Sequence, residues 1–333
     1  MRYFLAIDIG ASSGRHIVGW QENGEIKTNE VYRFPNGVQE ANGHLTWDVC
    51  KLFTNVVDGI LEAFKQYSQL ESLSIDAWGV DYVPPRLGRA QRHNISYLLN
   101  TEEVGEYLDL NHVIRIIPLG FDATSIIGKI FIVTGTGKYF KNVDSDPETN
   151  LGIVRIAADG KNAELLWGYK DGGTFTSEFP AHLMSHMARL SVDPKNRVVM
   201  HCHPTHTLAM NYVHELDEKK FTHTLWEMCT ECIVVFPDGV GVLPWMLCGT
   251  NSIGEATAEK MKEFRLVVWG MHGIYGAGKT MDETFGLIET VEKAAQIYML
   301  TAHLPRVNTI RDDQMVELAE FFGVKYRKDF LNL

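Results

Sequence analysis

A stretch rich in proline and arginine divides the chain into two parts with different patterns. It begins at Pro84-Pro85 and runs to His93. Proline cannot join the hydrogen-bond ladder of a central strand, so the apolar run before Pro84 must end there. A chain of 333 residues is long enough for two domains. We therefore predict a first domain over residues 1–83, a junction over 84–93 and a second domain over 94–333.

The first part has the pattern of a small sheet with one helix. Alternating apolar residues and turn signals predict three strands, a helix and a last strand, at Tyr3–Ile9, His16–Gln21, Glu25–Phe34, Trp47–Tyr67 and Leu73–Val80. Asn23-Gly24 is a strong signal for a two-residue hairpin turn. The first part is therefore expected to form a β-β-β-α-β unit.

The second part mixes short apolar strands with helical periodicity, which predicts an α/β domain with a mixed sheet flanked by helices. The predicted strands are Phe131–Thr134, Gly152–Ile156, Val198–Met200, Cys232–Phe236 and Leu266–Trp269. The predicted helices are Ser177–Leu190, Thr205–Val213, Gly254–Phe264 and Asp282–Tyr298.

Composition argues against several classes of function. The chain has 31 Lys and Arg against 42 Asp and Glu, a net charge of −11, which disfavours nucleic acid and anionic membranes as partners. No apolar run approaches the ~20 residues that span a bilayer, and the first residues lack the pattern of a secretory signal. Five cysteines are too few for a disulfide scaffold, so we expect a protein of the reducing cytoplasm.

Three histidines form a candidate metal site. His201 and His203 follow an apolar strand, and alternate residues of a strand point to the same face, so both imidazoles can reach one ion. His272 ends another apolar strand and is flanked by glycines. Three histidines with an open position are typical of a catalytic zinc site. The alternative is a pair of structural histidines in a loop.

Two carboxylates accompany the histidines. Glu178 lies at the predicted start of a helix, where Thr176 or Ser177 could cap the first turn and the helix terminus could bind an anion. The alternative for Glu178 is a first-turn carboxylate that the helix dipole favours. Glu231 precedes the predicted strand at 232–236, and its alternative is a solvated loop charge.

One motif favours a different function. Gly273–Thr280 matches the P-loop pattern and lies between a strand and a helix. However, Thr280 and Glu283 have the spacing of a capping box, which would use the hydroxyl that a P-loop gives to magnesium. A nucleotide-dependent kinase or P-loop protein therefore remains the alternative function.

Two further residue pairs are weaker candidates for functional motifs. Cys229 and Cys232 have the spacing of a redox or zinc pair, but no second pair exists and chance spacing is favoured. His182 and His186 would share one helix face, yet Leu183 occupies the position of the glutamate in a metalloprotease motif.

The beginning of the chain resembles a family of sugar kinases. Asp8 and the following Gly10–Arg15 segment come after a strand, where such a turn can bind phosphates. Met1–Trp20 and Ser74–Tyr82 resemble the start of rhamnulokinases, which belong to the actin/hexokinase-like superfamily. The resemblance ends near residue 83, before any second lobe or catalytic aspartate. Since phosphoryl transfer requires jointly positioned groups, we expect a fragment without kinase activity.

The second part resembles the class II, zinc-dependent aldolases that act on L-rhamnulose 1-phosphate, over about residues 90–333. The matching segments are Asn94–Tyr97, Phe131–Lys138, Leu151–Val154, Thr176–His182, Met200–His203, Leu225–Glu227, Thr230–Cys232, Val235–Trp245 and Asp282–Ile288. The resemblance implies a class II aldolase-like fold, a cytoplasmic homotetramer, and aldol cleavage to dihydroxyacetone phosphate and L-lactaldehyde in rhamnose catabolism.

The resemblance also implies a role for each matched residue. His201, His203 and His272 would bind one Zn²⁺ per subunit, which stabilises the enediolate charge. Glu178 would be the acid/base at the carbon beside the ketone, and Glu231 a second glutamate near the site of an adjacent subunit. The phosphate and other substrate groups would contact four residues, Asn94, Thr136, Thr176 and Ser177.

The junction departs from the family pattern. The family has Asn-Gly-Gly-Asn after an N-terminal helix, where this chain has Gln91-Arg92-His93-Asn94 and no such helix. Glycine permits close backbone approach to a phosphate, whereas Arg92 and His93 carry bulky side chains. We expect weaker phosphate binding with zinc binding intact; at the extreme, the domain is a folded but inactive remnant.

Overall fold

The computed structural model describes residues 2–10, 12–37, 39–41, 44–46, 48–67, 69–77 and 94–332. The chain separates into two compact units, Met1–Leu87 and Gly88–Leu333, and each unit is described by itself. The junction residues Gln91-Arg92-His93, the Pro84-Pro85 pair and the end of the strand predicted at 73–80 lie outside the described residues.

The first unit is a four-stranded sheet with one helix. The strand order is β3-β2-β1-β6, with β6 parallel to β1. The elements are β1 (Tyr3–Ile9), β2 (Ser13–Glu22), β3 (Glu25–Pro35), α1 (Val49–Gln66) and β6 (Leu70–Ala77). The sequence missed a small hairpin of β4 (Gln39–Ala41) and β5 (His44–Thr46), because three-residue strands carry almost no periodic signal. The β-β-β-α-β order is otherwise as predicted.

The hairpin turn between β2 and β3 follows from its two residues. Asn23 and Gly24 have φ angles of 52° and 82°. Both central residues of a type I′ turn need positive φ, which asparagine and glycine tolerate best. The turn predicted at this position is therefore present.

The core of the first unit is small and incompletely covered. Leu5 and Ile7 of β1 are buried beneath α1 with Val18 and Val56. The neighbouring β6 residues in register with them, Leu73 and Ile75, remain about half exposed, at 49% and 51%. Among the described residues, α1 packs chiefly on β2 and β3, so the β6 part of this sheet face stays partly exposed.

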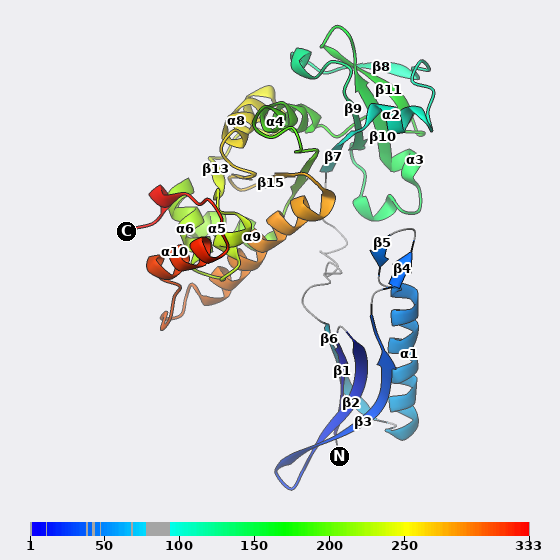
Figure 1. Ribbon diagram of the computed structural model, residues 1–333, viewed down its shortest axis with the longest axis vertical. Helices are drawn as coiled ribbons and strands as arrows, with labels where there is room; N and C mark the ends of the chain where they lie inside the picture. The colour runs from blue at the N-terminus through cyan, green and yellow to red at the C-terminus, as the bar shows by residue number, and fades with distance from the viewer. Residues whose placement is uncertain are drawn as a thin grey trace. The chain divides into compact units, whose positions relative to one another are not determined.

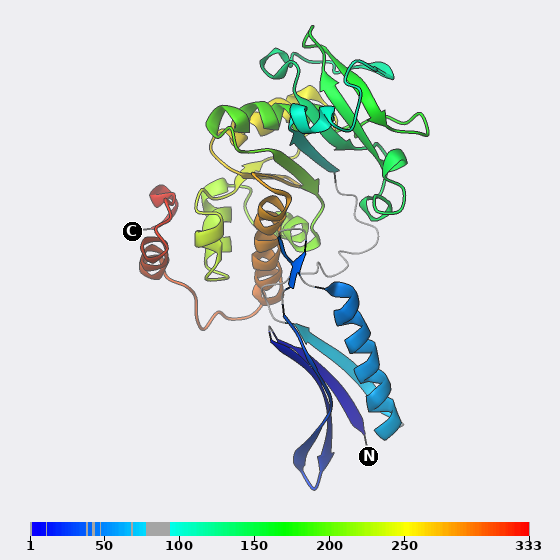
Figure 2. The ribbon, with the colours of Figure 1, turned by 45° about the vertical axis from the view of Figure 1, so that its right-hand side comes forward.

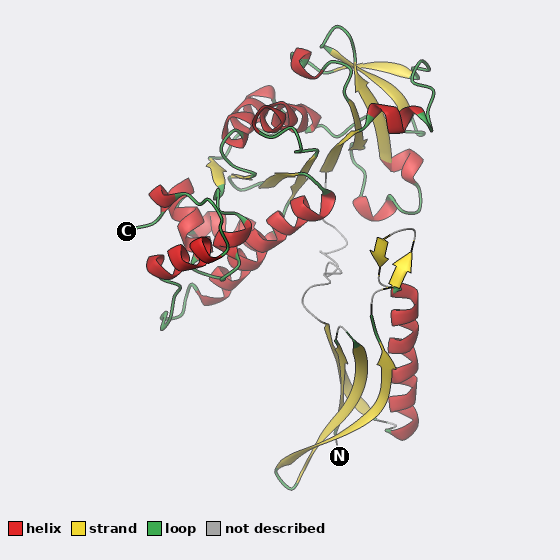
Figure 3. Cartoon of the chain, viewed as in Figure 1, coloured by secondary structure: helices red, strands yellow, loops and turns green. Residues whose placement is uncertain are grey.

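The second unit is built on a nine-stranded sheet of order β13-β14-β15-β12-β7-β9-β10-β11-β8. Its strands are β7 (Asn94–Leu99), β8 (Arg115–Pro118), β9 (Ile130–Thr134), β10 (Leu151–Ile156), β11 (Asn162–Gly168), β12 (Val198–Cys202), β13 (Gly241–Leu243), β14 (Leu266–Trp269) and β15 (Gly273–Gly278). Among the described strands of this sheet, only β13 and β14 pair in parallel, so the sheet is mixed, as expected. Figure 3 shows its strands in yellow and the surrounding helices in red.

Helices cover both faces of the central strands. The described helices of this unit are α2 (Thr101–Gly105), α3 (Pro147–Asn150), α4 (Phe179–Val192), α5 (Thr205–Val213), α6 (Glu218–Trp226), α7 (Cys232–Val235), α8 (Asn251–Met261), α9 (Met281–Thr301) and α10 (Asp312–Phe321), with three short 3₁₀ turns. In Figures 1 and 2, α4 and α8 lie together, apart from the group of α5, α6, α9 and α10.

The alternation along β12 explains which face carries the candidate site. Val198, Met200 and Cys202 pack in the core with α5, α6 and α9. Val199 packs in the core formed with α4 and α8, and His201 shares its face because alternate residues point the same way. All five residues of the strand are buried, as expected for a sheet covered on both sides.

Two sequence predictions of local structure were wrong. Cys232–Phe236 is not a strand: Cys232–Val235 forms the short helix α7, which packs against α9 and α10. A short apolar run fits a buried helix turn as well as a strand, so periodicity could not decide. The expected cap of α4 is also absent, because neither Thr176 nor Ser177 occupies its N-cap position. Glu178 occupies the N-cap position, with no side-chain capping bond, and Pro180 fits in the first turn because it needs no N–H there.

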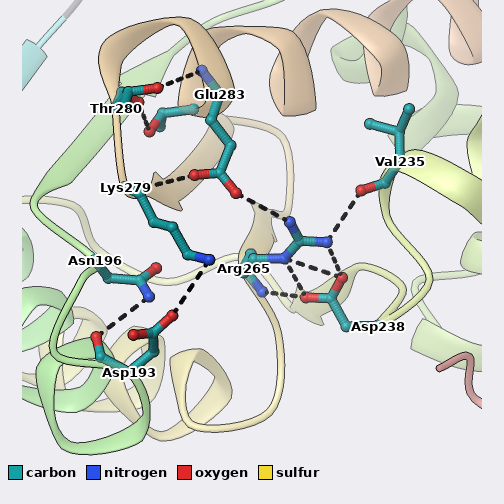
Figure 4. Close-up of polar contacts among 9 residues, drawn as sticks. Asp193, Asn196, Val235, Asp238, Arg265, Lys279, Thr280 and Glu283 are labelled. Atoms are coloured by element: carbon teal, nitrogen blue, oxygen red, sulfur yellow. Dashed lines mark hydrogen bonds and ion pairs between the residues drawn. The ribbon is translucent and has the colours of Figure 1, made fainter. Parts of the chain in front are cut away.

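An ion-pair cluster closes the β14–β15 hairpin at its open end (Figure 4). Arg265, which precedes β14, bonds to the Asp238 carboxylate at 2.6 Å and to the Val235 carbonyl at 3.0 Å. Its other terminal nitrogen lies 3.6 Å from Glu283 in the first turn of α9. The cluster therefore fixes the strands that carry His272 against α9.

Candidate active site

Three histidines from two segments meet at one point of the second unit. His201 is in β12, His203 follows that strand, and His272 is in the turn between β14 and β15. Ligand atoms of the three imidazoles all lie within 4.8 Å of one another. The structure thus brings together three residues that the sequence singled out: His201 in β12, His203 just after that strand, and His272, which is 69 positions further along than His203.

A tight turn places His272. Trp269 and Gly273 pair across the hairpin, and the His272 N–H donates to the Trp269 carbonyl at 3.0 Å. Met271 has a φ of 58°, which lets the chain reverse within three residues. A Cβ at Gly273 would lie 2.3 Å from the Cys202 carbonyl oxygen and 2.8 Å from the His203 ring. Glycine is therefore required where the turn passes the other two histidines.

The hydrogen bonds of His201 leave one ring nitrogen available to a metal. Burial lowers the pKa of His201 to about 3, so its ring is neutral at neutral pH. Its Nδ1–H donates to the Ile274 carbonyl at 3.0 Å, and Nε2 then carries a lone pair. That Nε2 lies 3.1 Å from the His203 Nε2. Fixing the outer nitrogen on a backbone carbonyl is how metal-binding histidines are usually oriented, so this donor set fits a metal ion.

The Glu178 carboxylate completes the cluster from the start of α4. One oxygen lies 3.2 Å from His201 Nε2, and the other lies 3.4 Å from His272 Nε2. Burial alone would raise the pKa of this carboxyl, but electrostatic interaction with the His201 ring and a hydrogen bond to His272 outweigh burial and lower the pKa of Glu178 below its usual range. Glu178 is therefore ionised at neutral pH and can accept a proton or approach a cation.

Asn94 and Tyr275 flank His201 on the neighbouring strands. Both are in register with His201, Asn94 on β7 and Tyr275 on β15. The Asn94 amide donates to Glu178 at 3.3 Å, and the Tyr275 hydroxyl donates to the same oxygen at 3.2 Å. The Tyr275 ring also stacks on His201, with centroids 4.4 Å apart. The sequence indicated Asn94 but missed Tyr275, because the strand pairing that aligns Tyr275 with His201 is not visible in the sequence.

Replacing Tyr275 with phenylalanine should lower kcat about tenfold and leave KM unchanged. The change removes the hydroxyl that holds Glu178 and keeps the ring that stacks on His201. A hydrogen bond to a charged group is worth roughly 1.5 kcal/mol or more, which corresponds to about this factor. Steady-state kinetics measure the effect, with Tyr212→Phe on the exposed surface of α5 as the matched control. Equal kcat in the Tyr275 variant and the control would refute this role.

Asn94 lies in β7, whereas the other three predicted phosphate and substrate contacts, Thr136, Thr176 and Ser177, lie on two adjacent loops. The Thr136 N–H donates to the Thr174 carbonyl at 2.8 Å, and the Thr176 N–H donates to the Thr134 carbonyl at 2.9 Å. Thr176 is buried, and its hydroxyl accepts a bond from the Glu178 N–H at 3.4 Å, whereas Ser177 is exposed at the start of α4. The loops therefore adjoin Glu178, and Ser177 offers an exposed hydroxyl beside it.

Glu231 lies elsewhere on the chain. It is exposed and accepts a bond from the Cys229 thiol at 2.5 Å. No hydrogen bond or ion pair joins Glu231 to the three histidines among the described residues. The described cysteines, Cys202, Cys229, Cys232 and Cys248, are all free thiols. A place for Glu231 at a neighbouring subunit's site therefore remains a prediction.

Two competing motifs have structural roles. Gly273–Gly278 forms β15, which pairs with β12 and β14 on its two sides, so it is not a phosphate-binding loop. Thr280 caps α9 by accepting from the Glu283 N–H at 3.1 Å, as the capping-box interpretation expected. His182 and His186 are buried and share the Ser96 hydroxyl, at 2.8 and 2.9 Å. They form an internal polar cluster behind the site.

The candidate phosphate-binding turn of the first unit has a different partner. Asp8 pairs with Arg15 across β1 and β2, and their charged groups lie 2.7 Å apart. The carboxylate that would face a magnesium–nucleotide complex is therefore neutralised within the chain.

No helix within the described ranges has the length and apolar character needed to cross a bilayer.

Residues 121–299 match the family described as "Class II Aldolase and Adducin N-terminal domain". The fold also resembles the crystal structure of a sugar-phosphate aldolase from Thermotoga maritima, with a TM-score of 0.56 and 28% identity. That match covers 67% of this chain and 90% of the other. The mixed sheet, the histidine cluster and these matches define a class II aldolase.

Relatives with higher sequence identity show which family of class II aldolases the chain belongs to. A rhamnulose-1-phosphate aldolase of Listeria monocytogenes (serotype 4b, strain CLIP80459) is 60% identical over 250 residues, which are 74% of this chain and 92% of the relative. One from Escherichia coli O81 (strain ED1a) is 46% identical over 69% of this chain and 85% of the relative. The chain therefore belongs to the rhamnulose-1-phosphate aldolase family of lyases. The sugar-kinase resemblance of the first unit remains a prediction.

Proposed function

We propose that the second unit cleaves L-rhamnulose 1-phosphate to dihydroxyacetone phosphate and L-lactaldehyde, with one zinc ion per chain. The observation that carries the proposal is the convergence of His201, His203 and His272 around the ionised Glu178 carboxylate. The names of the relatives support the choice of substrate. The free thiols fit a reducing cytoplasm.

The three histidines would hold the zinc ion. The Nε2 of His201 is unprotonated, because Nδ1 carries the proton, and it lies 3.1 Å from the His203 Nε2. A bound zinc ion supplies Lewis-acid stabilisation of the negative charge that develops on the ketone oxygen. The buried hydrogen bond that the His201 Nδ1–H donates to the Ile274 carbonyl keeps that ring oriented. The protein thus supplies a preorganised, largely dry donor set.

Glu178 would move the proton at C3 of the substrate. When the C3–C4 bond breaks, its electron pair stays with the three-carbon fragment, and C4 becomes the aldehyde carbon after its hydroxyl loses a proton. That proton would pass to the ionised Glu178 carboxylate, which then delivers it to C3 and completes dihydroxyacetone phosphate. Asn94 and Tyr275 hold the carboxylate for this transfer. In a homotetramer, Glu231 of an adjacent subunit would assist the removal of the proton from the C4 hydroxyl.

Thr136, Thr176 and Ser177 would bind the substrate phosphate through their hydroxyl groups. The start of α4 adds the positive end of its helix dipole, which favours an anion. Among these groups, the Ser177 hydroxyl is exposed beside Glu178. This arrangement would place the phosphate next to the acid/base.

The test is direct product analysis with the full chain. Incubation with L-rhamnulose 1-phosphate should release dihydroxyacetone phosphate and L-lactaldehyde in equal amounts, measured by NADH-coupled reduction and by NMR. L-fuculose 1-phosphate serves as the stereochemical control and should be cleaved more slowly. An unchanged rhamnulose 1-phosphate signal in zinc-loaded protein would refute the proposed function.

The same preparation should show no ATP-dependent phosphorylation of L-rhamnulose. Phosphoryl transfer needs a base and a metal–nucleotide site positioned together, whereas the described part of the first unit offers a small sheet whose Asp8 is paired with Arg15. Thin-layer chromatography with γ-labelled ATP measures the product, and an authentic sugar kinase is the positive control. Labelled sugar phosphate above the protein-free background would contradict this expectation.

A further inference from the structure

Helix α5 begins directly after the histidine segment without a cap of its own. Its N-cap residue is Pro204, which has no side-chain capping bond. The first N–H groups of a helix have no partner within the helix, and a serine, threonine, asparagine or aspartate usually supplies one. Proline has no group that could do so. The start of α5 must therefore find an acceptor elsewhere.

Glu292 of α9 is that acceptor. One carboxylate oxygen accepts from the His206 backbone N–H and from the His206 ring nitrogen Nδ1, both at 2.9 Å. The other oxygen accepts from the Thr207 backbone N–H at 2.8 Å and from the Thr207 hydroxyl at 2.7 Å. The Glu292 side chain is 16% exposed, so these four bonds are made largely away from solvent. Both oxygens are fully engaged with one short segment.

The position of this contact links it to the metal site. His203 lies between the end of β12 at Cys202 and the start of α5 at Thr205. On one side the chain is held by the sheet pairing of β12 with β15, and on the other side by Glu292. The packing of α5 against α9 keeps the acceptor in place. His203, unlike His201, lies outside the strand, between these two anchors.

We propose that Glu292 is a positioning residue for zinc binding, which acts by fixing the His203–Pro204 segment through the first turn of α5. The inference rests on the proposed function, because it assumes that His203 binds the ion. Glu292 itself does not touch the metal or the substrate. Its negative charge at a helix N-terminus adds to the four hydrogen bonds, since that end of the helix dipole favours an anion.

Two variants of Glu292 separate hydrogen bonding from packing. Glu292→Ala removes all four bonds. Glu292→Gln keeps the size, but its NH₂ group faces donors where the carboxylate oxygen accepted. We expect zinc affinity to fall about 10–100-fold in the alanine variant, the usual effect of removing a group that orients a ligand, and by a smaller factor in the glutamine variant. Competition with a chromophoric zinc chelator measures the dissociation constant without recourse to activity.

Asp217→Ala is the matched control. Asp217 caps α6 by accepting from the Lys220 N–H at 2.9 Å, and α6 carries none of the three histidines. Asp217→Ala and Glu292→Ala should each lower the melting temperature of the zinc-free protein. Only the Glu292 variants should also lose zinc affinity. A Glu292→Ala protein with wild-type zinc affinity would overturn the inference. Wild-type protein that binds no zinc would instead refute the proposed function, so the two failures are distinct.

Discussion

Replacing His201 with alanine is expected to remove zinc and aldolase activity together. His201 is fully buried, and its Nε2 lies 3.1 Å from His203 Nε2 and 3.2 Å from Glu178. Among the described residues, three histidines form the cluster, so the loss of one leaves two imidazoles there, too few for a stable catalytic zinc site. His272→Ala should have the same effect because its imidazole closes the cluster from a separate turn.

Elemental analysis of the purified variants gives the zinc content, and product release gives the activity. His112→Ala, which changes an exposed histidine in a loop, should keep both at the wild-type level. Circular dichroism confirms that each variant is folded. Full zinc occupancy in both His201→Ala and His272→Ala would show that the cluster is not the metal site.

Glu178→Gln should keep the metal and lower kcat by about 10²–10⁴-fold. The amide has nearly the same shape as the carboxylate but cannot carry a proton to or from C3, and a positioned general acid/base contributes a factor of this size. The three histidines are unchanged, so zinc content should remain near the wild-type value. Single-turnover kinetics distinguish this loss from a slower product release.

Glu231→Gln is the comparison for that measurement. The described structure brings Glu178 to the histidines and leaves Glu231 exposed next to Cys229. If Glu178→Gln turns over at the wild-type rate, the acid/base must be another group, and Glu231 is the next candidate. A large loss in both variants would support two separate proton transfers.

The sequence predicted the parts of the site that depend on local pattern. His201 and His203 are two positions apart at the end of an apolar strand, and a period of two places them on one face. The predicted strands at 131–134, 152–156 and 266–269 are present, because each is an apolar run bounded by turn residues. The resemblance to the family was needed to assign Glu178 its acid/base role.

Other parts depend on contacts between distant segments and could not be predicted from pattern. Tyr275 reaches Glu178 only because β15 pairs with β12 in a particular register. Glu292 caps α5 only because α9 packs beside it, 85 residues from Thr207 along the chain. The strand predicted at 232–236 was wrong because a helix turn buries the same apolar residues. In each case tertiary packing determines the contact or the local structure, which the local sequence does not predict.

The central claim is that a histidine-bound zinc ion in this chain supports cleavage of L-rhamnulose 1-phosphate. Its most direct test measures zinc content and dihydroxyacetone phosphate release in one preparation, before and after metal is removed with a chelator and restored. We expect one zinc per chain, loss of activity on removal, and recovery at one equivalent of added zinc. Metal-free protein that cleaves the substrate at the original rate would contradict this account.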